Sequence, residues 1–326
     1  MPLSTSVVLC TCNGARYLRA QWDSLLAQTR LPDEIVVRDD ASSDATPALL
    51  DDLARAATTR GVSLRLSRNP RNLGYVANFE AALRDATGEV LLLCDQDDVW
   101  HSDKLAVLAE QFERRRSLLL LCTDARRVDA AGEPLQRSLF QSLKLTHVEL
   151  RRIHAGQGFE VLLRRSLATG ATVALRRSLL ADALPFPQGW VHDEWLAIMA
   201  AARGGFDCME LSLVDYRQHA TNQIGMPDRG LAAKWHDLRR PRAALIEGLI
   251  ARNETLLQRL QSLGNAVPAI HAVQTLDKLH HLRVRSAVHG PPWKRLGRVL
   301  RESLNGHYRV HGTGWRSALR DLLRRD

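Results

Sequence analysis

Short apolar runs alternate with amphipathic stretches over the first 125 residues of the chain. The runs are of strand length, and the stretches after them carry apolar residues at helical spacing. The predicted strands span residues 6–10, 34–37, 63–66, 89–93 and 118–122. The first predicted helix follows Asn13, which is a good N-cap. Further helices are predicted over residues 46–57, 76–85 and 102–116. This order predicts a parallel, doubly wound α/β sheet.

The pattern loosens after residue 130. Residues 130–165 are basic and irregular, residues 168–175 predict a strand, a helix is expected around Trp195, and residues 209–216 predict another strand. Beyond about residue 230 the pattern is purely helical. We therefore expect a main α/β domain over residues 1–228 and a helical C-terminal region over residues 229–326.

The sequence predicts neither a membrane-spanning protein nor a secreted one. No run of 18 apolar residues occurs, and the first residues lack the basic stretch of a secretory signal, so neither a spanning helix nor a signal peptide is expected. The five cysteines are an odd number, and four lie in or beside apolar runs, which is typical of reduced, buried thiols in a cytosolic protein. Cys10 and Cys12 are not a C-x-x-C pair, so the cysteines predict no zinc site.

The net charge of +9 is distributed unevenly along the chain. Residues 1–230 hold 27 Lys/Arg against 29 Asp/Glu, a net of −2, whereas residues 231–326 hold 18 against 7, a net of +11. A neutral body with a basic tail predicts attachment to something anionic. We expect no nucleic-acid binding, because the tail shows no recognisable nucleic-acid motif.

The segment 293–304 has the make-up of a helix that lies on a membrane surface. It sets apolar residues against basic ones, the apolar set being Trp293, Leu296, Leu300 and Leu304 and the basic set Lys294, Arg295, Arg298 and Arg301. We expect peripheral binding to anionic lipid. Packing of the helices on the main domain, or on a second copy in a homodimer, is the alternative.

Polar side chains follow three of the predicted strands. Thr11 and Asn13 follow the first, Asp39 and Asp40 the second, and residues 95–98 (Asp-Gln-Asp-Asp) the fourth. Ligands of such sheets bind beyond the carboxyl ends of the strands. Clustered carboxylates repel one another unless a cation or hydrogen-bond donors offset their charge, and oxygen ligands favour Mg²⁺ or Mn²⁺. From these residues alone, a solvated turn that caps the next helix is an equally good interpretation.

Several linked motifs resemble, in order and spacing, those of family-2 inverting glycosyltransferases. They are Thr11-Cys12-Asn13-Gly14 with Tyr17-Leu18, Asp39-Asp40-Ala41-Ser42-Ser43-Asp44, Asn72-Leu73-Gly74 with Asn78, and Asp95-Gln96-Asp97-Asp98-Val99-Trp100. His192-Asp193-Glu194-Trp195 and Tyr216-Arg217-Gln218-His219 extend the resemblance to about residue 225. The residues in these motifs are most similar to those of the bacterial rhamnosyltransferase-like subgroup.

The resemblance implies the glycosyltransferase type A fold, which is the nucleotide-diphospho-sugar transferase fold, and a role for each matching residue. The DxD motif would be residues 95–97 with Asp98 adjoining, and Mg²⁺ or Mn²⁺ would be held by Asp95, Asp97 and Asp98. Asp193 would be the general base, with Glu194 as the alternative. The nucleotide-sugar site would include Thr11, Asn13, Asp40, Asn72 and Asp95, with Arg217 and His219 on the diphosphate side.

The resemblance implies a metal-dependent, inverting hexosyltransferase that moves a sugar from a dTDP- or UDP-linked donor. Rhamnose is the first sugar to consider. The acceptor would be a hydroxyl of a cell-surface glycan, a lipid-linked sugar or a polysaccharide, reached from the cytosolic face of the inner membrane. His192 departs from the family pattern, because many members carry Glu before the base. This departure weakens any transfer of acceptor specificity.

Three other classes compete with this interpretation. An inactive nucleotide-sugar-fold adaptor would bind a membrane or polyanion through the tail, but the presence of Asp97 and Asp193 argues against it. A nucleotidyltransferase would want a glycine-rich basic phosphate loop, which residues 11–16 do not form. A dehydrogenase is disfavoured because no GxGxxG follows the first strand.

Overall fold

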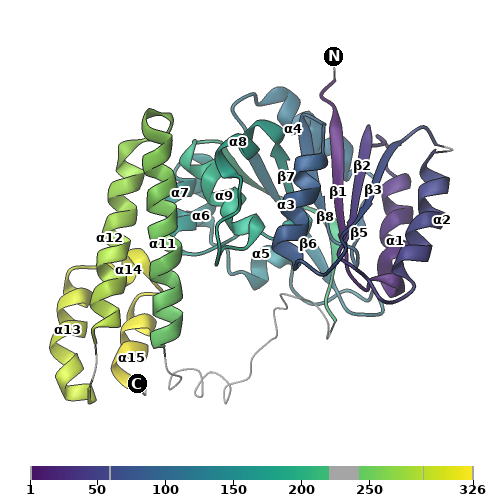
Figure 1. The fold of residues 1–326 in the computed structure, drawn as a ribbon. Coiled ribbons are helices and arrows are strands. Elements are labelled where there is room, and N and C mark those ends of the chain that lie inside the picture. Colours follow the sequence, from purple (N-terminus) through teal and green to yellow (C-terminus); the bar gives the residue numbers. More distant parts are fainter. Residues whose placement is uncertain (1, 59, 220–241, 289, 325–326) are drawn as a thin grey trace. The chain divides into compact units, whose positions relative to one another are not determined.

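A computed structural model describes residues 2–58, 60–219, 242–288 and 290–324 (Figure 1). The chain divides into two compact units. The first, the N-terminal unit, comprises residues 1–158, 167–186 and 191–225, and the second, the C-terminal unit, comprises residues 159–166, 187–190 and 226–326. The domain boundary that the sequence predicts between residues 228 and 229 lies outside the described residues.

The N-terminal unit is built on an eight-stranded sheet with the order β3-β2-β1-β4-β7-β6-β8-β5. Neighbours among β1 to β4 are parallel, β7 runs antiparallel to β4 and β6, and β8 is parallel to β6 and antiparallel to β5. The mostly parallel α/β sheet that the sequence predicts is thereby confirmed. The strands are β1 (Thr5–Thr11), β2 (Glu34–Asp39), β3 (Ser63–Arg68), β4 (Val90–Cys94), β5 (Val99–Trp100), β6 (Leu120–Val128), β7 (Val173–Arg176) and β8 (Phe206–Arg217).

Helices cover the sheet and bury its central strands. Every residue of β1 and of β4 is buried, as expected of parallel strands that are covered on both faces. Helix α3 packs on β1 and β2, and α2 packs on β3. The helices are α1 (Ala15–Leu26), α2 (Thr46–Thr58), α3 (Tyr75–Asp85), α4 (Lys104–Arg114), α5 (Leu139–Ser142), α6 (His147–His154), α7 (Gly158–Arg164, at the junction of the units), α8 (Leu180–Ala183) and α9 (His192–Ala202).

Two local predictions are wrong. Residues 130–165 are not irregular, because α5 and α6 each begin with a capping box, formed by Ser138 with Gln141 and by Thr146 with Glu149. The strand expected over residues 168–175 is shorter, since a 3-10 turn at Gly170–Thr172 precedes β7.

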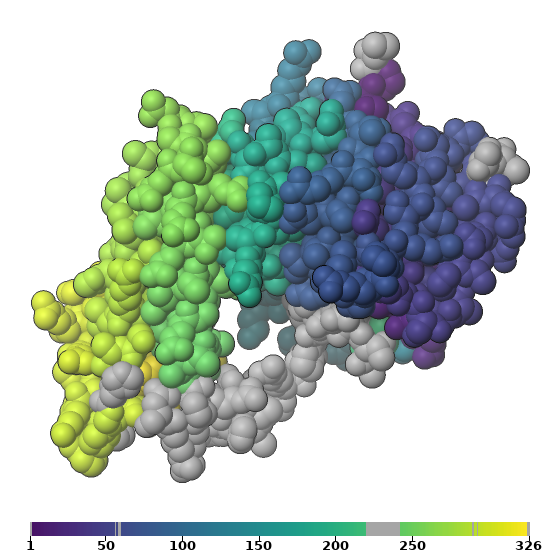
Figure 2. All heavy atoms as spheres, viewed as in Figure 1, coloured from purple at the N-terminus to yellow at the C-terminus, as the bar shows by residue number. Residues whose placement is uncertain are grey.

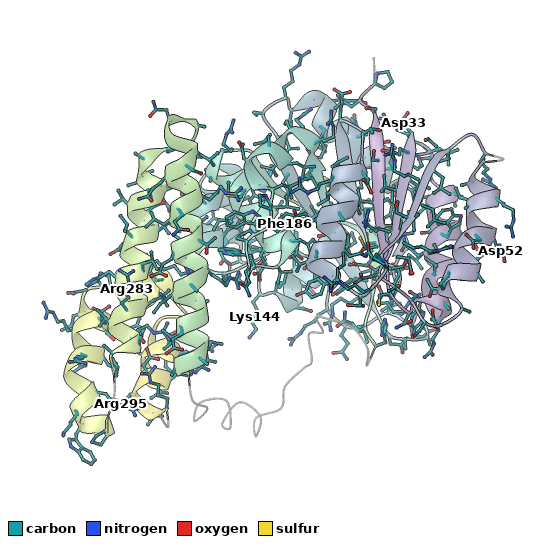
Figure 3. The ribbon with its side chains drawn as sticks, viewed as in Figure 1. Asp33, Asp52, Lys144, Phe186, Arg283 and Arg295 are labelled. Carbon is teal, nitrogen blue, oxygen red and sulfur yellow. The ribbon has the colours of Figure 1, made fainter. Side chains whose placement is uncertain are left out.

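The two edges of the sheet differ in their polar groups. At the carboxyl edge, the pairing of Thr11 with Asp39 and of Leu9 with Cys94 aligns the ends of β1, β2 and β4. At the amino edge, Asp33 (labelled in Figure 3) accepts hydrogen bonds from the backbone N–H and the hydroxyl of Thr5 at 2.8 and 2.9 Å. Hydrogen bonds between Thr5 and Asp33 therefore pair polar groups at the amino edge, and the acidic cluster lies at the carboxyl edge.

A hollow of about 750 Å³ also lies on the side of the amino edge. Glu89, which precedes β4, and Arg176, which ends the antiparallel β7, contribute to its lining. Since Cys94 ends β4 at the opposite edge, this hollow is separate from the acidic cluster, and we do not assign it to the site described below.

The C-terminal unit contains the helices that the sequence predicts beyond residue 230. They are α11 (Ala243–Leu263), α12 (Ala269–Ser286), α13 (Pro292–Leu304), α14 (His307–His311) and α15 (Trp315–Leu323). Their core includes Val288, Val299 and Tyr308. Arg295, labelled in Figure 3, is not on an exposed polar face as expected, because it is 4% exposed and its guanidinium donates to the carbonyl of Arg324 at 2.6 Å.

Two composition-based expectations concern the whole chain. Within the described ranges, no helix combines the length and the apolar character needed to cross a membrane. All five cysteines are unpaired thiols, four of them buried and Cys12 half-buried.

Candidate functional site

The acidic loop between β4 and β5 is fastened to the loop after β1 by one side chain. The amide of Gln96 accepts a hydrogen bond from the backbone N–H of Cys12 at 2.8 Å and donates one to the carbonyl of Cys12 at 3.0 Å. A Cβ on Gly14 would lie 2.0 Å from the amide oxygen of Gln96, so only glycine leaves room for this contact. Gln96, which lies between Asp95 and Asp97, thus positions the loop.

The end of β8 delivers a guanidinium and an imidazole to this acidic loop. Since Val99 pairs with Asp215, the residues that follow in β8 lie beside the loop. The backbone N–H of Arg217 donates to Oδ1 of Asp98 at 2.9 Å, and its Nε donates to the carbonyl of Asp97 at 2.8 Å. These contacts join predicted site residues that are about 120 positions apart in the chain.

A second contact comes from His219, whose Nε2 lies 2.8 Å from Oδ2 of Asp97. The imidazole of His219 stacks on the ring of Tyr17 with centres 4.8 Å apart, and the guanidinium of Arg217 lies 5.0 Å from the same ring. Tyr17 therefore contacts both side chains beside the acidic loop.

The carboxylates of this loop are short of compensating charge. Asp98 is 1% exposed, and among the described residues its Oδ2 has no hydrogen-bond partner. Burial raises the pKa of Asp98 well above its usual value, and the negative charges of Asp97 and Asp95 add to the effect. Burial, with Asp97 and Asp193, also raises the pKa of Asp95 to about 7. A bound cation would offset this charge and displace the protons.

A cation bound at this loop would take only part of its ligands from the protein. Within the described ranges, no three carboxylates of this loop place oxygens close enough together to surround an ion by themselves. Mg²⁺ and Mn²⁺ accept oxygen ligands, and Mg²⁺ is commonly held by one or two carboxylates together with phosphate oxygens. The unpartnered oxygen of Asp98 and its two acidic neighbours fit such an ion.

A buried lysine that sequence reasoning missed lies behind the loop. Lys104 is wholly buried, its ammonium donates to the carbonyl of Ala171 at 2.8 Å, and it lies 3.8 Å from the ring centre of Trp100. Burial lowers its pKa to about 7, although the charges of Asp98 and Asp95 oppose the shift. The sequence signal was a cation at the first residue of a helix, an end that favours negative charge.

Asp193, the predicted base, lies in the first turn of α9. Its Oδ2 accepts a hydrogen bond from the backbone N–H of Gly170 at 2.8 Å, and its Oδ1 accepts one from the N–H of Glu194 at 2.7 Å. The residue is 7% exposed. Burial raises the pKa of Asp193 to about 7, and the charge of Glu194 contributes. This carboxyl group is therefore tuned to exchange a proton near neutral pH.

Gly170 separates the two halves of the site. A Cβ on this glycine would lie 3.2 Å from Nε2 of His192, 3.7 Å from Oδ2 of Asp193 and 3.9 Å from Oδ2 of Asp95. Both carboxylates thus face the same small space, which any larger side chain at position 170 would fill. The importance of this glycine depends on what lies opposite it, and the local sequence did not show this.

His192 forms a wall of the site and is not a proton-transfer group. Its buried ring stacks on Phe79 with centres 4.2 Å apart, and among the described residues neither ring nitrogen has a hydrogen-bond partner. Burial lowers the pKa of His192 to about 3, so the ring is neutral at physiological pH.

The polar residues after β1 and β2 hold two loops together. The hydroxyl of Thr11 donates to Asp39 at 2.8 Å. Asn13 does not cap α1, as its type suggests, because Gly14 occupies the N-cap position and the Asn13 side chain accepts a hydrogen bond from the N–H of Ser43 at 2.8 Å. Asn13 itself is exposed.

Asp40 organises the loop after β3. Its oxygens accept hydrogen bonds from the N–H groups of Leu73 and Gly74 at 2.8 and 2.9 Å and from the amide of Asn69 at 2.7 Å. Asn72, from the same loop, donates to the carbonyl of Asp40 at 3.3 Å. The predicted nucleoside-site residues thus lie on connected loops at the carboxyl edge of the sheet.

Solved structures share this fold at low sequence identity. TarS of S. aureus, determined in complex with UDP-GlcNAc, is 17% identical with a TM-score of 0.57, over 98% of this chain and 90% of that one. The mannosyltransferase PcManGT of Pyrobaculum calidifontis, in complex with GDP-Man and Mn²⁺, is 18% identical with a TM-score of 0.54, over 99% of this chain and 86% of that one. These likenesses support a glycosyltransferase type A architecture.

Relatives in sequence include the uncharacterized protein Rv1520 of Mycobacterium tuberculosis, which is 27% identical over 220 residues, or 66% of this chain. This chain spans only 59% of the length of that relative. An uncharacterized glycosyltransferase of Nostoc, alr2836, is 35% identical over 111 residues, which are 34% of this chain and 33% of that protein. The family described as glycosyl transferase family 2 matches residues 6–182. This match covers more than half of the chain, and the chain therefore belongs to glycosyl transferase family 2.

Proposed function

We propose that this chain is an inverting glycosyltransferase, which moves a sugar from a nucleotide-diphosphate donor to a hydroxyl acceptor with the help of a divalent cation. The observation that carries the proposal is the placement of Asp95 and Asp193 around the space beside Gly170. One carboxylate belongs to the acidic loop that would hold the leaving group, and the other belongs to a helix start on the far side of that space. Inversion needs such an arrangement, since the acceptor attacks from the face opposite the diphosphate.

Asp193 would act as the general base. Its two backbone hydrogen bonds fix the carboxylate in one orientation, and its pKa of about 7 leaves a large ionised fraction at neutral pH. A carboxylate within hydrogen-bond reach of the acceptor hydroxyl removes its proton as the new glycosidic bond forms. Glu194 is the alternative base, but its nearer role is to raise the pKa of Asp193.

The leaving diphosphate would be met by the acidic loop and by the end of β8. Asp95, Asp97 and Asp98 would hold Mg²⁺ or Mn²⁺, which when bound supplies positive charge to the departing phosphates. Arg217 and His219 would keep the loop in place through their contacts to Asp97, and Arg217 would offer a positive charge beside it.

The donor is a nucleotide-linked sugar. TarS and PcManGT, which share the fold, were solved with UDP-GlcNAc and with GDP-Man and Mn²⁺. Thr11, Asn13, Asp40 and Asn72 lie on connected loops where the nucleoside would bind. We propose dTDP-rhamnose and UDP-sugars as the first donors to test, with a glycan or lipid-linked hydroxyl as acceptor.

The test separates donor binding from transfer by comparing two variants. Thermal-shift titrations with dTDP-, UDP- and GDP-sugars, with and without Mn²⁺, should reveal a metal-dependent stabilisation in the unaltered protein. Asp97→Asn should weaken this stabilisation, whereas Asp193→Asn should retain it and lose sugar transfer. Transfer that survives in Asp193→Asn would refute the assignment of the base, and a protein that binds donors but transfers no sugar would favour the inactive adaptor.

We further propose that the C-terminal unit docks on an anionic membrane surface. Helix α13 presents Trp293, Leu296, Leu300 and Leu304 to the outside, with exposures of 74, 44, 51 and 86%. Figure 2 shows the lime-coloured α13 at an outer edge of this unit. Exposed Lys294, Arg298 and Arg301 lie on the same helix. An apolar stripe beside basic residues is suited to an anionic lipid interface.

Vesicle co-sedimentation tests this surface. The full chain should bind vesicles that contain phosphatidylglycerol, and the binding should weaken in high salt and on neutral phosphatidylcholine vesicles. Trp293→Ser with Leu304→Ser should reduce binding several-fold, whereas Ile270→Ser, at a similarly exposed apolar site on α12, should not. A dimer in solution whose vesicle binding is absent would instead identify the stripe as a contact between two copies.

A further inference from the structure

A second cluster of metal-ligand side chains lies in the C-terminal unit. His281 on α12, Glu302 on α13 and His307 at the start of α14 each place one ligand atom within 4.8 Å of the other two. Among the described residues, this is the one group of three or more His, Cys, Asp or Glu side chains that meets this condition. Their side chains are 0, 7 and 21% exposed, so the cluster is a built part of the interior.

The donor set suits a transition-metal dication. Two imidazoles and a carboxylate are borderline ligands that favour Zn²⁺ over Mg²⁺ or Ca²⁺. With zinc bonds of about 2.0–2.1 Å, tetrahedral ligand atoms lie about 3.3 Å apart. Oε2 of Glu302 lies 2.6 Å from Nδ1 of His281 and 2.9 Å from Nδ1 of His307, so movements of less than about 1 Å would open a site of this size.

The ring of His281 is buried, with one of its two nitrogens paired and the other unpaired within the described ranges. His281 is wholly buried, and among the described residues its Nε2 has no hydrogen-bond partner. Leaving a buried polar atom unpaired is costly, and such atoms are rare in folded proteins. Nδ1, the nitrogen that faces Glu302 at 2.6 Å, is the one that an ion in the cluster would bind.

A third imidazole completes the surroundings of the cluster. The ring centre of His311 lies 5.9 Å from that of His281 and 6.2 Å from that of His307, and the latter two are 5.8 Å apart. Nε2 of His311 is held by a carboxylate oxygen of Asp277 at 2.7 Å. A carboxylate that orients an imidazole in this way is common around bound zinc. His311, Asp277 or water would supply the fourth ligand.

Arg285, a cation near the cluster, is already neutralised. Arg285 lies on the same helix as His281, and its guanidinium would oppose a metal ion if its charge were free. Instead it makes two hydrogen bonds to the carboxylate of Asp321, at 2.6 and 3.1 Å, in a buried pair. The net charge around the cluster therefore permits a dication.

We propose that His281, Glu302 and His307 form a binding site for Zn²⁺ or a similar transition-metal ion, which ties α12, α13 and α14 together. Because α14 packs on both other helices (Figure 1), an ion here would cross-link three segments that follow one another along the chain. The site is independent of the proposed Mg²⁺ or Mn²⁺ site, which lies in the N-terminal unit.

Competition titration tests the proposal on the full chain after treatment with a chelator. Zn²⁺ is titrated against a chromogenic chelator in excess Mg²⁺, and in an Asp97→Asn background so that the acidic loop does not contribute. We expect one equivalent of Zn²⁺ to bind with a dissociation constant below about 1 µM. It should also raise the melting temperature.

Matched variants give the decisive comparison. His307→Ala should weaken Zn²⁺ binding at least tenfold and remove the thermal shift, and Glu302→Gln, which keeps the size of the side chain, should weaken it as well. His280→Ala, at an exposed neighbour on α12, should leave both readouts unchanged. Failure to bind Zn²⁺, or an equal effect of His307→Ala and His280→Ala, would overturn the proposal. Loss of sugar transfer by itself would not affect it.

Discussion

Asp193→Asn should stabilise the folded protein at neutral pH while it removes activity. Burial first, and the charge of Glu194 second, raise the pKa of Asp193 from 3.8 to about 7. Between these two pH values the folded protein keeps a proton that the unfolded chain releases, so stability falls as the pH rises from about 4 to about 7. At about 1.4 kcal/mol per pKa unit, the carboxylate destabilises the fold by about 4 kcal/mol above pH 7.

The amide side chain that replaces this carboxylate would carry no charge and would avoid the penalty. Asp193 accepts hydrogen bonds from the N–H groups of Gly170 and Glu194. In the variant, one of these N–H groups would face the NH₂ of the new amide, which costs about 1 kcal/mol or more. The net gain at pH 8 is about 2–3 kcal/mol, which corresponds to a rise of about 5–10 °C in melting temperature.

Thermal unfolding at pH 5 and pH 8 measures this effect. The variant should gain stability relative to the unaltered protein only at the higher pH. Asp23→Asn, at an exposed carboxylate of α1 that pairs with Arg19, is the control and should change little at either pH. A difference between variant and unaltered protein that is equal at both pH values, or a variant that is less stable at pH 8, would refute the reasoning.

Three further substitutions test the packing of the site. Gly170→Ala should lower kcat/KM at least tenfold, because its methyl group enters the space between two carboxylates and presses on Nε2 of His192; Gly248→Ala, with open space around it, is the control for activity. Gly14→Ala should lower the melting temperature and the donor affinity, and less so when Gln96→Ala removes the clashing amide, which a double-mutant cycle would measure. Lys104→Met should raise the pKa of Asp95 further, because it removes the nearby positive charge that opposes this shift; thermal unfolding between pH 5 and pH 8 measures the change, and an unaltered pH dependence would contradict this.

The order of strands and helices in the N-terminal unit was predictable because each element has its own local pattern of apolar and polar residues. Apolar runs such as residues 90–94 have the length of buried strands, and the leucines of the following helices repeat at helical spacing. The order of strands in the sheet was not predictable, since the antiparallel insertion of β7 between β4 and β6 depends on pairings between distant segments. The helices α5 and α6 were predictable in principle, because both capping boxes stand in the sequence.

Some residues of the candidate site were predictable from the sequence, and others were not. The acidic loop, Asp193 and the end of β8 were found because linked motifs resemble a known family. Lys104 and Gly170 were not found, because each matters only through what lies opposite it: the buried carboxylates for the lysine, and the space between Asp95 and Asp193 for the glycine. The C-terminal histidines were missed for the same reason, since His281 and His307 stand on separate helices.

The two edges of the sheet show where the fold gives up stability. At the amino edge, Glu34 is buried, but its carboxylate accepts hydrogen bonds from the hydroxyl of Ser6 at 2.5 Å and the N–H of Thr87 at 2.9 Å. At the carboxyl edge, Asp98 is equally buried and keeps an oxygen without a partner in the described ranges. Glu34, Asp39 and Asp40 therefore have hydrogen-bond partners, whereas one oxygen of Asp98 has none among the described residues. Since unpaired buried charge is costly, this contrast is the physical signature of a site made ready for a ligand.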